Sequence, residues 1–209
     1  HESTPDCMSY VIATQLIPSD PAAFRASIPE MIRPKLEALG AQYVVAQESI
    51  AAGPQMGVFT MGSRWSSIDR GFTALDEFYA DPEVIATLAA TPVQPVGRMA
   101  GVVEAERGNP SGTYTVAFSS SVDNFDRSQS EDFYDTVSSI MIGAGVNGMR
   151  MIRWVAAGEL TGSWAALFYT DSLDAYMAGI GELYAEPKAT SVMAQWGMRP
   201  LSRTISIGH

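Results

Sequence analysis

The sequence predicts an α+β fold built from two consecutive copies of a β-α-β-β-α-β unit. Three observations support this prediction: the chain repeats itself, strand-like and helical runs follow the same order in each copy, and the strand runs are apolar on both faces. Shifted by 105 residues, segments 40–98 and 145–203 align without a gap and share 14 identities over 59 positions. A period of this length is too long for a solenoid repeat and indicates two whole units.

The repeat divides the chain into a first unit at 1–107 and a second unit at 108–209. Each unit is near the lower end of the sizes that can build a core of their own. Most repeated positions are turn residues, and the plainest examples are the phrases FYADPE at 78–83 and LYAEPK at 183–188. We therefore expect the repeat to reflect architecture more than chemistry.

The first unit opens with a β-rich run, followed by a helix that Pro29 and Pro34 must kink or divide. A hairpin with a glycine-containing turn, a second helix and a last strand complete the unit. The predicted strands are 9–17, 41–50, 57–62 and 96–106, and the predicted helices are 21–39 and 67–80.

The second unit follows the same order. Its first helix begins at Asp126 and carries Phe133, Val137 and Met141 on one face, at helical spacing. The predicted strands are 113–122, 147–155, 163–169 and 201–208, and the predicted helices are 126–143 and 172–185.

Polar residues mark the helix starts. Ser66 with Asp69, and Asp171 with Asp174, have the spacing of capping boxes. Asp81 and Glu186 stand where an N-cap belongs, each before a proline that suits the first position of a short following helix. The repeated phrase is thus expected to separate two helices.

Composition argues against two classes of partner. The formal net charge is −10, and Lys35 and Lys188 are the only lysines, so the chain should repel nucleic acids. No run of 18 apolar residues occurs, so we expect no membrane span. The opening HESTPDC lacks the features of a signal peptide, which favours a cytoplasmic location while leaving open a leader already removed.

The residues suited to cofactor or metal ligation are few. His1 and His209 are the only histidines and stand at the two ends, where residues of an added tag are as consistent with them as native ones. The lone Cys7 lies in a polar segment with no sign of an activated thiolate. We therefore predict no metal site and no cofactor, haem included.

The stretch WSSIDRGFTALDEFYADPE at 65–83 resembles the pattern of antibiotic-biosynthesis monooxygenases and NIPSNAP-like proteins. With the element order, it is similar to the dimeric α+β barrel superfamily, in a tandem single-chain form. That resemblance implies two ferredoxin-like units whose antiparallel sheets pack together, and we expect them to pack face to face. Such proteins include cofactor-free monooxygenases, haem-degrading enzymes, isomerases, chlorite dismutase and proteins without known activity, so the fold decides little about function.

Tyr79 and Arg98, with their copies Tyr184 and Arg203, are the candidate catalytic residues. The arginine could orient a carboxylate or stabilise an enolate, the tyrosine could donate a hydrogen bond or a proton, and Glu77 could act as the base. The alternative is a surface Glu–Arg pair with a tyrosine that caps the sheet, and repetition in both units favours this alternative.

Aromatic and arginine residues at the strand edges suggest an apolar cavity for a small aromatic or polyketide-like molecule. The sequence does not decide between monooxygenase- or isomerase-like chemistry and binding alone, nor does it exclude homo-oligomers. The alternative is a non-catalytic assembly or stress-associated protein with a solid core. The candidate ligand-binding residues are Arg64, Trp65, Arg150, Trp154 and Trp164.

Overall fold

The computed structural model describes residues 8–209, so His1 and Cys7 lie outside the described residues. The strands and helices occur in the predicted order. Up to residue 108 the elements are β1 (Ser9–Pro18), α1 (Pro21–Ser27), η1 (Ile28–Ile32), α2 (Arg33–Ala38), β2 (Tyr43–Ala51), η2 (Gly53–Gln55), β3 (Phe59–Trp65), α3 (Ile68–Ala80), α4 (Pro82–Ala90) and β4 (Val93–Gly108).

The remaining elements repeat this order with one long helix in place of the divided one. They are β5 (Tyr114–Ser121), α5 (Arg127–Gly143), β6 (Gly148–Ala156), η3 (Gly158–Leu160), β7 (Trp164–Thr170), α6 (Leu173–Ala185), α7 (Pro187–Gln195) and β8 (Arg199–Gly208). Within residues 8–209, no helix has both the length and the hydrophobicity to cross a membrane.

The first helical segment is divided, as its prolines predict. α1 ends at Ser27, a π-helical turn, η1, follows, and α2 resumes with Pro34 in its first turn. Because proline lacks an N–H and its ring clashes with the preceding turn, a regular helix cannot continue through Pro29. The segment still buries one apolar face, including Phe24, Ile28 and Leu36.

Two predicted helix caps are wrong by one residue. Ser67 and Ser172, not Ser66 and Asp171, are the N-caps of α3 and α6, and each hydroxyl accepts from the main-chain N–H three residues on. Asp171 instead accepts hydrogen bonds from Thr113 and so ties the start of β5 to the end of β7. Two adjacent residues that can each cap a helix, Ser66 and Ser67 at α3 and Asp171 and Ser172 at α6, make the capping residue ambiguous in sequence.

The caps predicted from the repeated phrases are confirmed. Asp81 accepts from the main-chain N–H groups of Glu83 and Val84 at the start of α4, and Glu186 accepts from that of Lys188 at the start of α7. The repeated phrases therefore mark breaks between helices.

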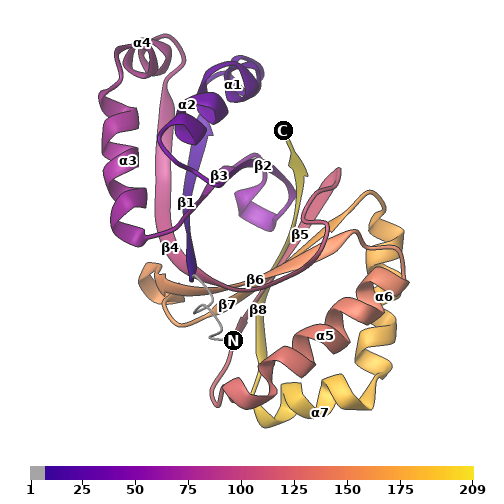
Figure 1. The fold of residues 1–209 in the computed structure, drawn as a ribbon. Helices are drawn as coiled ribbons and strands as arrows, with labels where there is room; N and C mark the ends of the chain where they lie inside the picture. The colour runs from indigo at the N-terminus through magenta and orange to yellow at the C-terminus, as the bar shows by residue number, and fades with distance from the viewer. Residues whose placement is uncertain (1–7) are drawn as a thin grey trace.

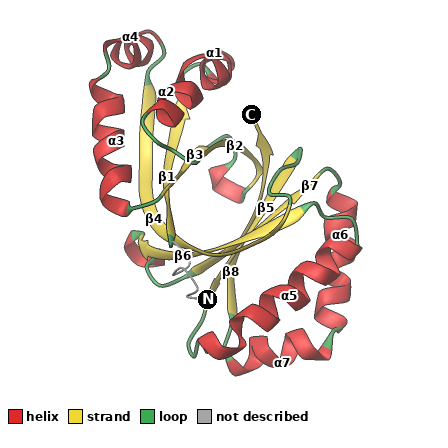
Figure 2. Ribbon diagram, viewed as in Figure 1, coloured by secondary structure: helices red, strands yellow, loops and turns green. Residues whose placement is uncertain are grey.

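All eight strands form one closed antiparallel barrel in the order β1-β3-β2-β8-β5-β7-β6-β4. We call β4-β1-β3-β2 the first sheet and β8-β5-β7-β6 the second sheet. The helices lie outside the barrel, with α1–α4 against the first sheet and α5–α7 against the second (Figures 1 and 2). The element order repeats along the chain, whereas the duplication and the division at residue 107 stay predictions.

Two seams join the sheets by their edges and close the barrel, and the inner faces of the two sheets contribute to one interior core, as expected for sheets that pack together. In one seam β2 pairs with β8, and in the other β4 pairs with β6 from Ala100↔Ala156 to Gly108↔Gly148. Edge pairing satisfies backbone groups that an open sheet would leave exposed.

Strand alternation gives three apolar cores. Two lie between a sheet and its helices, and they include Phe59 and Trp65 on the first side and Phe168 and Trp164 on the second. The third draws on strands of both sheets, with Val11 and Trp154 among its members, and fills part of the barrel interior.

The β4–β6 seam provides a test of barrel closure. A Cβ at Gly101 would lie 2.7 Å from Ile152 Cγ2 and 2.9 Å from Trp154 Cε3, whereas one at Gly97 on the same strand would meet nothing within 4 Å. We expect Gly101→Ala to lower the free energy of unfolding by about 1–3 kcal/mol through overpacking, measured by urea denaturation. The matched Gly97→Ala variant should stay within about 0.5 kcal/mol of wild type. Equal effects of the two variants would contradict a tight seam at Gly101.

Candidate functional site

A cavity of about 280 Å³ lies between the second sheet and helices α5–α7. We call it the helix-side cavity. Its wall is apolar and rich in flexible methionines and aromatic rings, and it contains no acidic, basic or histidine side chain. Lining residues include Met149, Met151, Met193, Met198, Phe118, Phe133 and Phe168.

Tyr134 on α5 lines this cavity. Its side chain is about 1% exposed, and its hydroxyl is buried without a hydrogen-bond partner among the described residues. Burial raises the pKa of Tyr134 well above its usual range, so the phenol stays protonated at physiological pH. Because buried polar groups are normally paired, a buried phenol without a partner in a residue that lines a cavity is unusual.

A second unpartnered phenol lies beside the cavity. Tyr176 on α6 packs on the lining residue Phe168, with ring centroids 5.6 Å apart, and its hydroxyl is also buried without a partner among residues 8–209. Burial, the largest effect, raises its pKa to about 12. Both tyrosines are therefore neutral hydrogen-bond donors at physiological pH.

Arg203 and Tyr184 stand at the edge of the cavity. Tyr184 lines it and is 49% exposed. The guanidinium carbon of Arg203 lies 5.2 Å from the ring centroid of Phe118 and 5.9 Å from that of Tyr176. Among the described residues, Arg203 makes no ion pair with a carboxylate. The predicted residues of the second unit thus lie near one cavity, while their catalytic role stays a prediction.

In the first sheet Tyr79 and Arg98 contact each other directly. Arg98 donates from Nη2 to the Tyr79 hydroxyl at 3.3 Å and from Nε to Thr14 at 3.0 Å. The space beneath this sheet's helices measures only about 60 Å³, and a shallow pocket of about 310 Å³ surrounds the exposed pair. Glu77 pairs with Arg70 instead of joining them. The helix side of the first sheet therefore has a small internal space and a separate, more open pocket at its edge.

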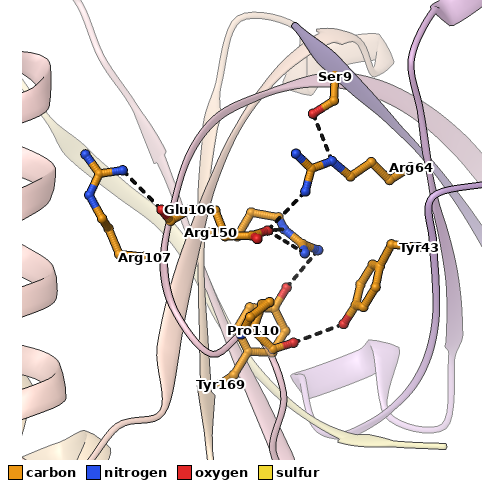
Figure 3. Close-up of polar contacts among 8 residues, drawn as sticks. All are labelled: Ser9, Tyr43, Arg64, Glu106, Arg107, Pro110, Arg150 and Tyr169. Atoms are coloured by element: carbon orange, nitrogen blue, oxygen red, sulfur yellow. Dashed lines mark hydrogen bonds and ion pairs between the residues drawn. The ribbon is translucent and has the colours of Figure 1, made fainter. Parts of the chain in front are cut away.

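The five predicted ligand-binding residues do not meet in one cavity. Trp65 lies in the helix-side core of the first sheet, Trp164 in that of the second, and Trp154 inside the barrel. Arg64 and Arg150 do come together, at one end of the barrel interior, as Figure 3 shows. The tryptophans lie apart because they come from different strands and because successive residues of a strand point to opposite faces of the sheet.

A polar cluster occupies that end of the barrel (Figure 3). Glu106 accepts from Arg150 at 2.7 Å and from Arg64 at 3.3 Å. The Arg150 guanidinium, only 3% exposed, lies 4.6 Å from the ring centroid of Tyr43 and donates to the Tyr169 hydroxyl at 3.2 Å. We call these five residues the barrel-end cluster. Sequence reasoning named both arginines but not the carboxylate they share.

Sequence reasoning also missed Tyr134 and Tyr176. Tyr134 lies three residues before Val137 and seven before Met141, so the helical spacing that assigned the buried face could have included it. No sequence signal shows that a buried hydroxyl lacks a partner, because that depends on packing from other elements.

The helix-side cavity does not fit a haem. Its lining has no histidine or cysteine, and about 280 Å³ lies at the lower limit of pockets that hold small organic ligands, which is too small for a porphyrin. His209 lies elsewhere, with Nε2 2.9 Å from Glu48. Within residues 8–209, no group of three or more histidine, cysteine or acidic side chains could hold a metal ion.

Solved structures share the architecture of this chain along nearly its whole length. An anthrone oxidase-like protein has a TM-score of 0.56 at 14% identity, covering 98% of this chain and 93% of its own. A heme-binding protein from Thermus thermophilus has a TM-score of 0.60 at 9% identity, with coverages of 96% and 91%. A mutant chlorite dismutase from Candidatus Nitrospira defluvii has 0.60 at 10%, with coverages of 99% and 92%.

The fold is a ferredoxin-like α+β barrel. No protein-family profile matches the sequence, and no curated protein matches it. The solved neighbours include a putative chlorite dismutase, an anthrone oxidase-like protein and a putative monooxygenase, and their likeness supports the expected barrel fold, while membership of the superfamily stays a prediction. At these identities the likeness shows the fold alone, and the narrower resemblance to NIPSNAP-like proteins stays a prediction.

Replacing Tyr134 tests whether its hydroxyl lacks a hydrogen-bond partner. Because Tyr134→Phe removes a buried hydroxyl that makes no hydrogen bond, we expect the free energy of unfolding to rise by about 1 kcal/mol. The comparison is Tyr43→Phe, which removes a hydroxyl that donates to the Pro110 carbonyl and should cost about 1 kcal/mol. Urea denaturation measures both. A loss in Tyr134→Phe as large as in Tyr43→Phe would show that the Tyr134 hydroxyl is bonded after all.

Proposed function

We propose that the protein binds a small, flat, mostly apolar organic molecule in the helix-side cavity of the second sheet. One observation carries the proposal: Tyr134, whose buried hydroxyl has no hydrogen-bond partner among the described residues, is one of the residues that line an apolar cavity of about 280 Å³. A ligand oxygen that accepted from this phenol would satisfy a group that the protein leaves unpaired. An aromatic or polyketide-like molecule with a phenolic, keto or carboxyl oxygen has this chemistry.

The lining supports an aromatic ligand. Met149 and Met151 on β6 and Met193 and Met198 around α7 present flexible thioethers, which adapt to flat ligands and make favourable contacts with ring edges. The space between the first sheet and its helices differs from the helix-side cavity of the second sheet. Met61 stands where the repeat has Ala166, and the space beside Met61 measures about 60 Å³, while a separate pocket of about 310 Å³ lies at the edge of the same side. The methionine- and aromatic-lined cavity therefore favours the second sheet as the side that binds the ligand.

Arg203 and Tyr184 would orient the polar end of such a ligand. Arg203 has no carboxylate partner among the described residues, so an anionic ligand group at the cavity edge would complete its interactions. The lining offers donors but no carboxylate or histidine that could act as a general base. The arrangement therefore favours binding of an acidic molecule, with any chemistry depending on an anion that the ligand forms by its own acidity and that Arg203 and Tyr184 stabilise.

One neighbour is described as anthrone oxidase-like, and anthrones are flat, weakly acidic aromatic ketones. That description agrees with the ligand class proposed from this cavity. For an enzymatic role without metal or haem, we propose reaction of the ligand's own anion with molecular oxygen as the oxidant. A ring CH2 becomes C=O with one oxygen atom, and the other oxygen atom leaves as water with the two hydrogens of that CH2.

Filling the cavity should abolish binding. Ala166→Met introduces into the lining the residue that the first sheet has at the equivalent position. We expect 2-naphthol to stabilise the wild-type protein, by about 2.7 kcal/mol at 100 times its Kd, and to have no effect on Ala166→Met. Thermal unfolding with increasing ligand measures this. The control Ala178→Met makes the same exchange on the exposed face of α6 and should keep full stabilisation. No stabilisation of the wild type by any flat aromatic compound would count against the proposal.

Removing the charge of Arg203 tests whether this residue orients an anionic group of the ligand. Arg203→Gln should weaken binding of 2-naphthoate by about 1 kcal/mol, roughly fivefold, and leave that of neutral 2-methylnaphthalene unchanged. Arg98→Gln makes the same change at the repeated position in the first sheet and serves as the control. Isothermal titration calorimetry measures the affinities. Equal losses for both ligands, or in both variants, would contradict a role for Arg203 in orienting an anion.

A further inference from the structure

A solvent-open pocket of about 400 Å³ lies where β8 ends beside β2. We call it the seam pocket. β8 pairs with β2 as far as Gln47↔Gly208, and the His209 main-chain N–H donates to the Ala46 carbonyl at 2.9 Å. Tyr43, Thr115 and Tyr169 line the pocket from the barrel side, and Arg33 lines it from α2. The seam pocket is therefore an opening toward the barrel-end cluster.

Two buried hydroxyls in this pocket have protons available for a ligand. Thr115 and Tyr169 are cross-strand partners on β5 and β7, and they are only 3% and 2% exposed. Thr115 Oγ1 accepts from the Gln47 amide at 2.8 Å, and Tyr169 Oη accepts from Arg150 at 3.2 Å. Neither hydroxyl donates to an acceptor within residues 8–209. Because each already accepts a hydrogen bond, each is polarised to donate one.

The charge behind the pocket is unbalanced. Arg64 and Arg150 share one carboxylate, that of Glu106, so the barrel-end cluster carries one excess positive charge (Figure 3). Arg150 is almost fully buried, and a buried charge is costly unless it is fully compensated. On the rim, Arg33 donates to the His209 main-chain carbonyl, and Glu37 contributes one acidic group. An anion in the pocket would offset the excess.

We infer that the seam pocket binds a small organic carboxylate. Its two oxygens would accept from Thr115 and Tyr169, and its single negative charge would balance the excess charge of the arginine pair. The pocket volume leaves room for a substituent that extends toward solvent.

This site is separate from the helix-side cavity. Along β7, Phe168 faces the helices while Tyr169 faces the barrel interior. A carboxylate without an apolar ring, such as acetate, should therefore bind the seam pocket and not the helix-side cavity. The Ala166→Met variant, whose helix-side cavity is filled, should bind acetate with unchanged affinity.

The test is a titration of the full chain with acetate at constant ionic strength, followed by ¹H–¹⁵N chemical shifts. We expect saturable shifts at Thr115, Tyr169 and the end of β8. Thr115→Val, which keeps the shape and loses the hydroxyl, should weaken acetate binding roughly tenfold, because hydrogen bonds to charged groups are among the stronger ones. Thr115→Ser retains the hydroxyl and should bind within about twofold of wild type. Tyr169→Phe should weaken binding as Thr115→Val does.

Several results would overturn the inference. They are the absence of saturable acetate binding to the wild type, equal affinities of Thr115→Val and Thr115→Ser, and saturable binding of inorganic phosphate without acetate. If Tyr169→Phe fails to fold because Arg150 loses an acceptor, the two Thr115 variants decide the matter. Tyr114→Phe, a change on the neighbouring residue of β5, controls for loss of a phenol outside the pocket.

Discussion

Backbone hydrogen bonding along the two seams is the constraint on which the rest of this structure depends. Neither sheet has another partner for its outer strands, and the barrel interior exists only because β2 meets β8 and β4 meets β6. A β-bulge between Val103 and Ala105 lets the long strand β4 pair with β1 along one part and β6 along another while it curves. The placement of every interior side chain follows from this closure.

Closure also divides the chemistry of the second sheet between its two faces. The helix-side cavity is lined mainly by apolar groups and neutral phenols, whereas the interior end of the barrel gathers charged groups. Successive residues of one strand therefore lie in different environments: Phe168 faces the helices, and Tyr169 faces the barrel interior. Neutral donors suit an uncharged or weakly acidic aromatic molecule, and the excess of arginine suits a small anion, so the two sites need not compete for one ligand.

The sequence predicted the element order, the helix divided at its prolines and the caps at Asp81 and Glu186, because each depends on local backbone chemistry. It did not predict which tryptophans share a core, since strand pairing and parity decide that. Glu104 and Glu106 illustrate the limit. Simple alternation puts both on one face, but the bulge lets Glu104 pair with Arg153 while Glu106 pairs with Arg150 in the interior. The unpaired hydroxyl of Tyr134 likewise depends on neighbours from distant elements.

The short connection at 109–113 between β4 and β5 has a consequence for assembly. It keeps the second sheet beside the first at an effective concentration that far exceeds any protein concentration in solution. Two separate chains that formed the same barrel would come apart on dilution, and their folding would depend on concentration. In this protein the barrel closes within one molecule, so its integrity is independent of how many copies are present.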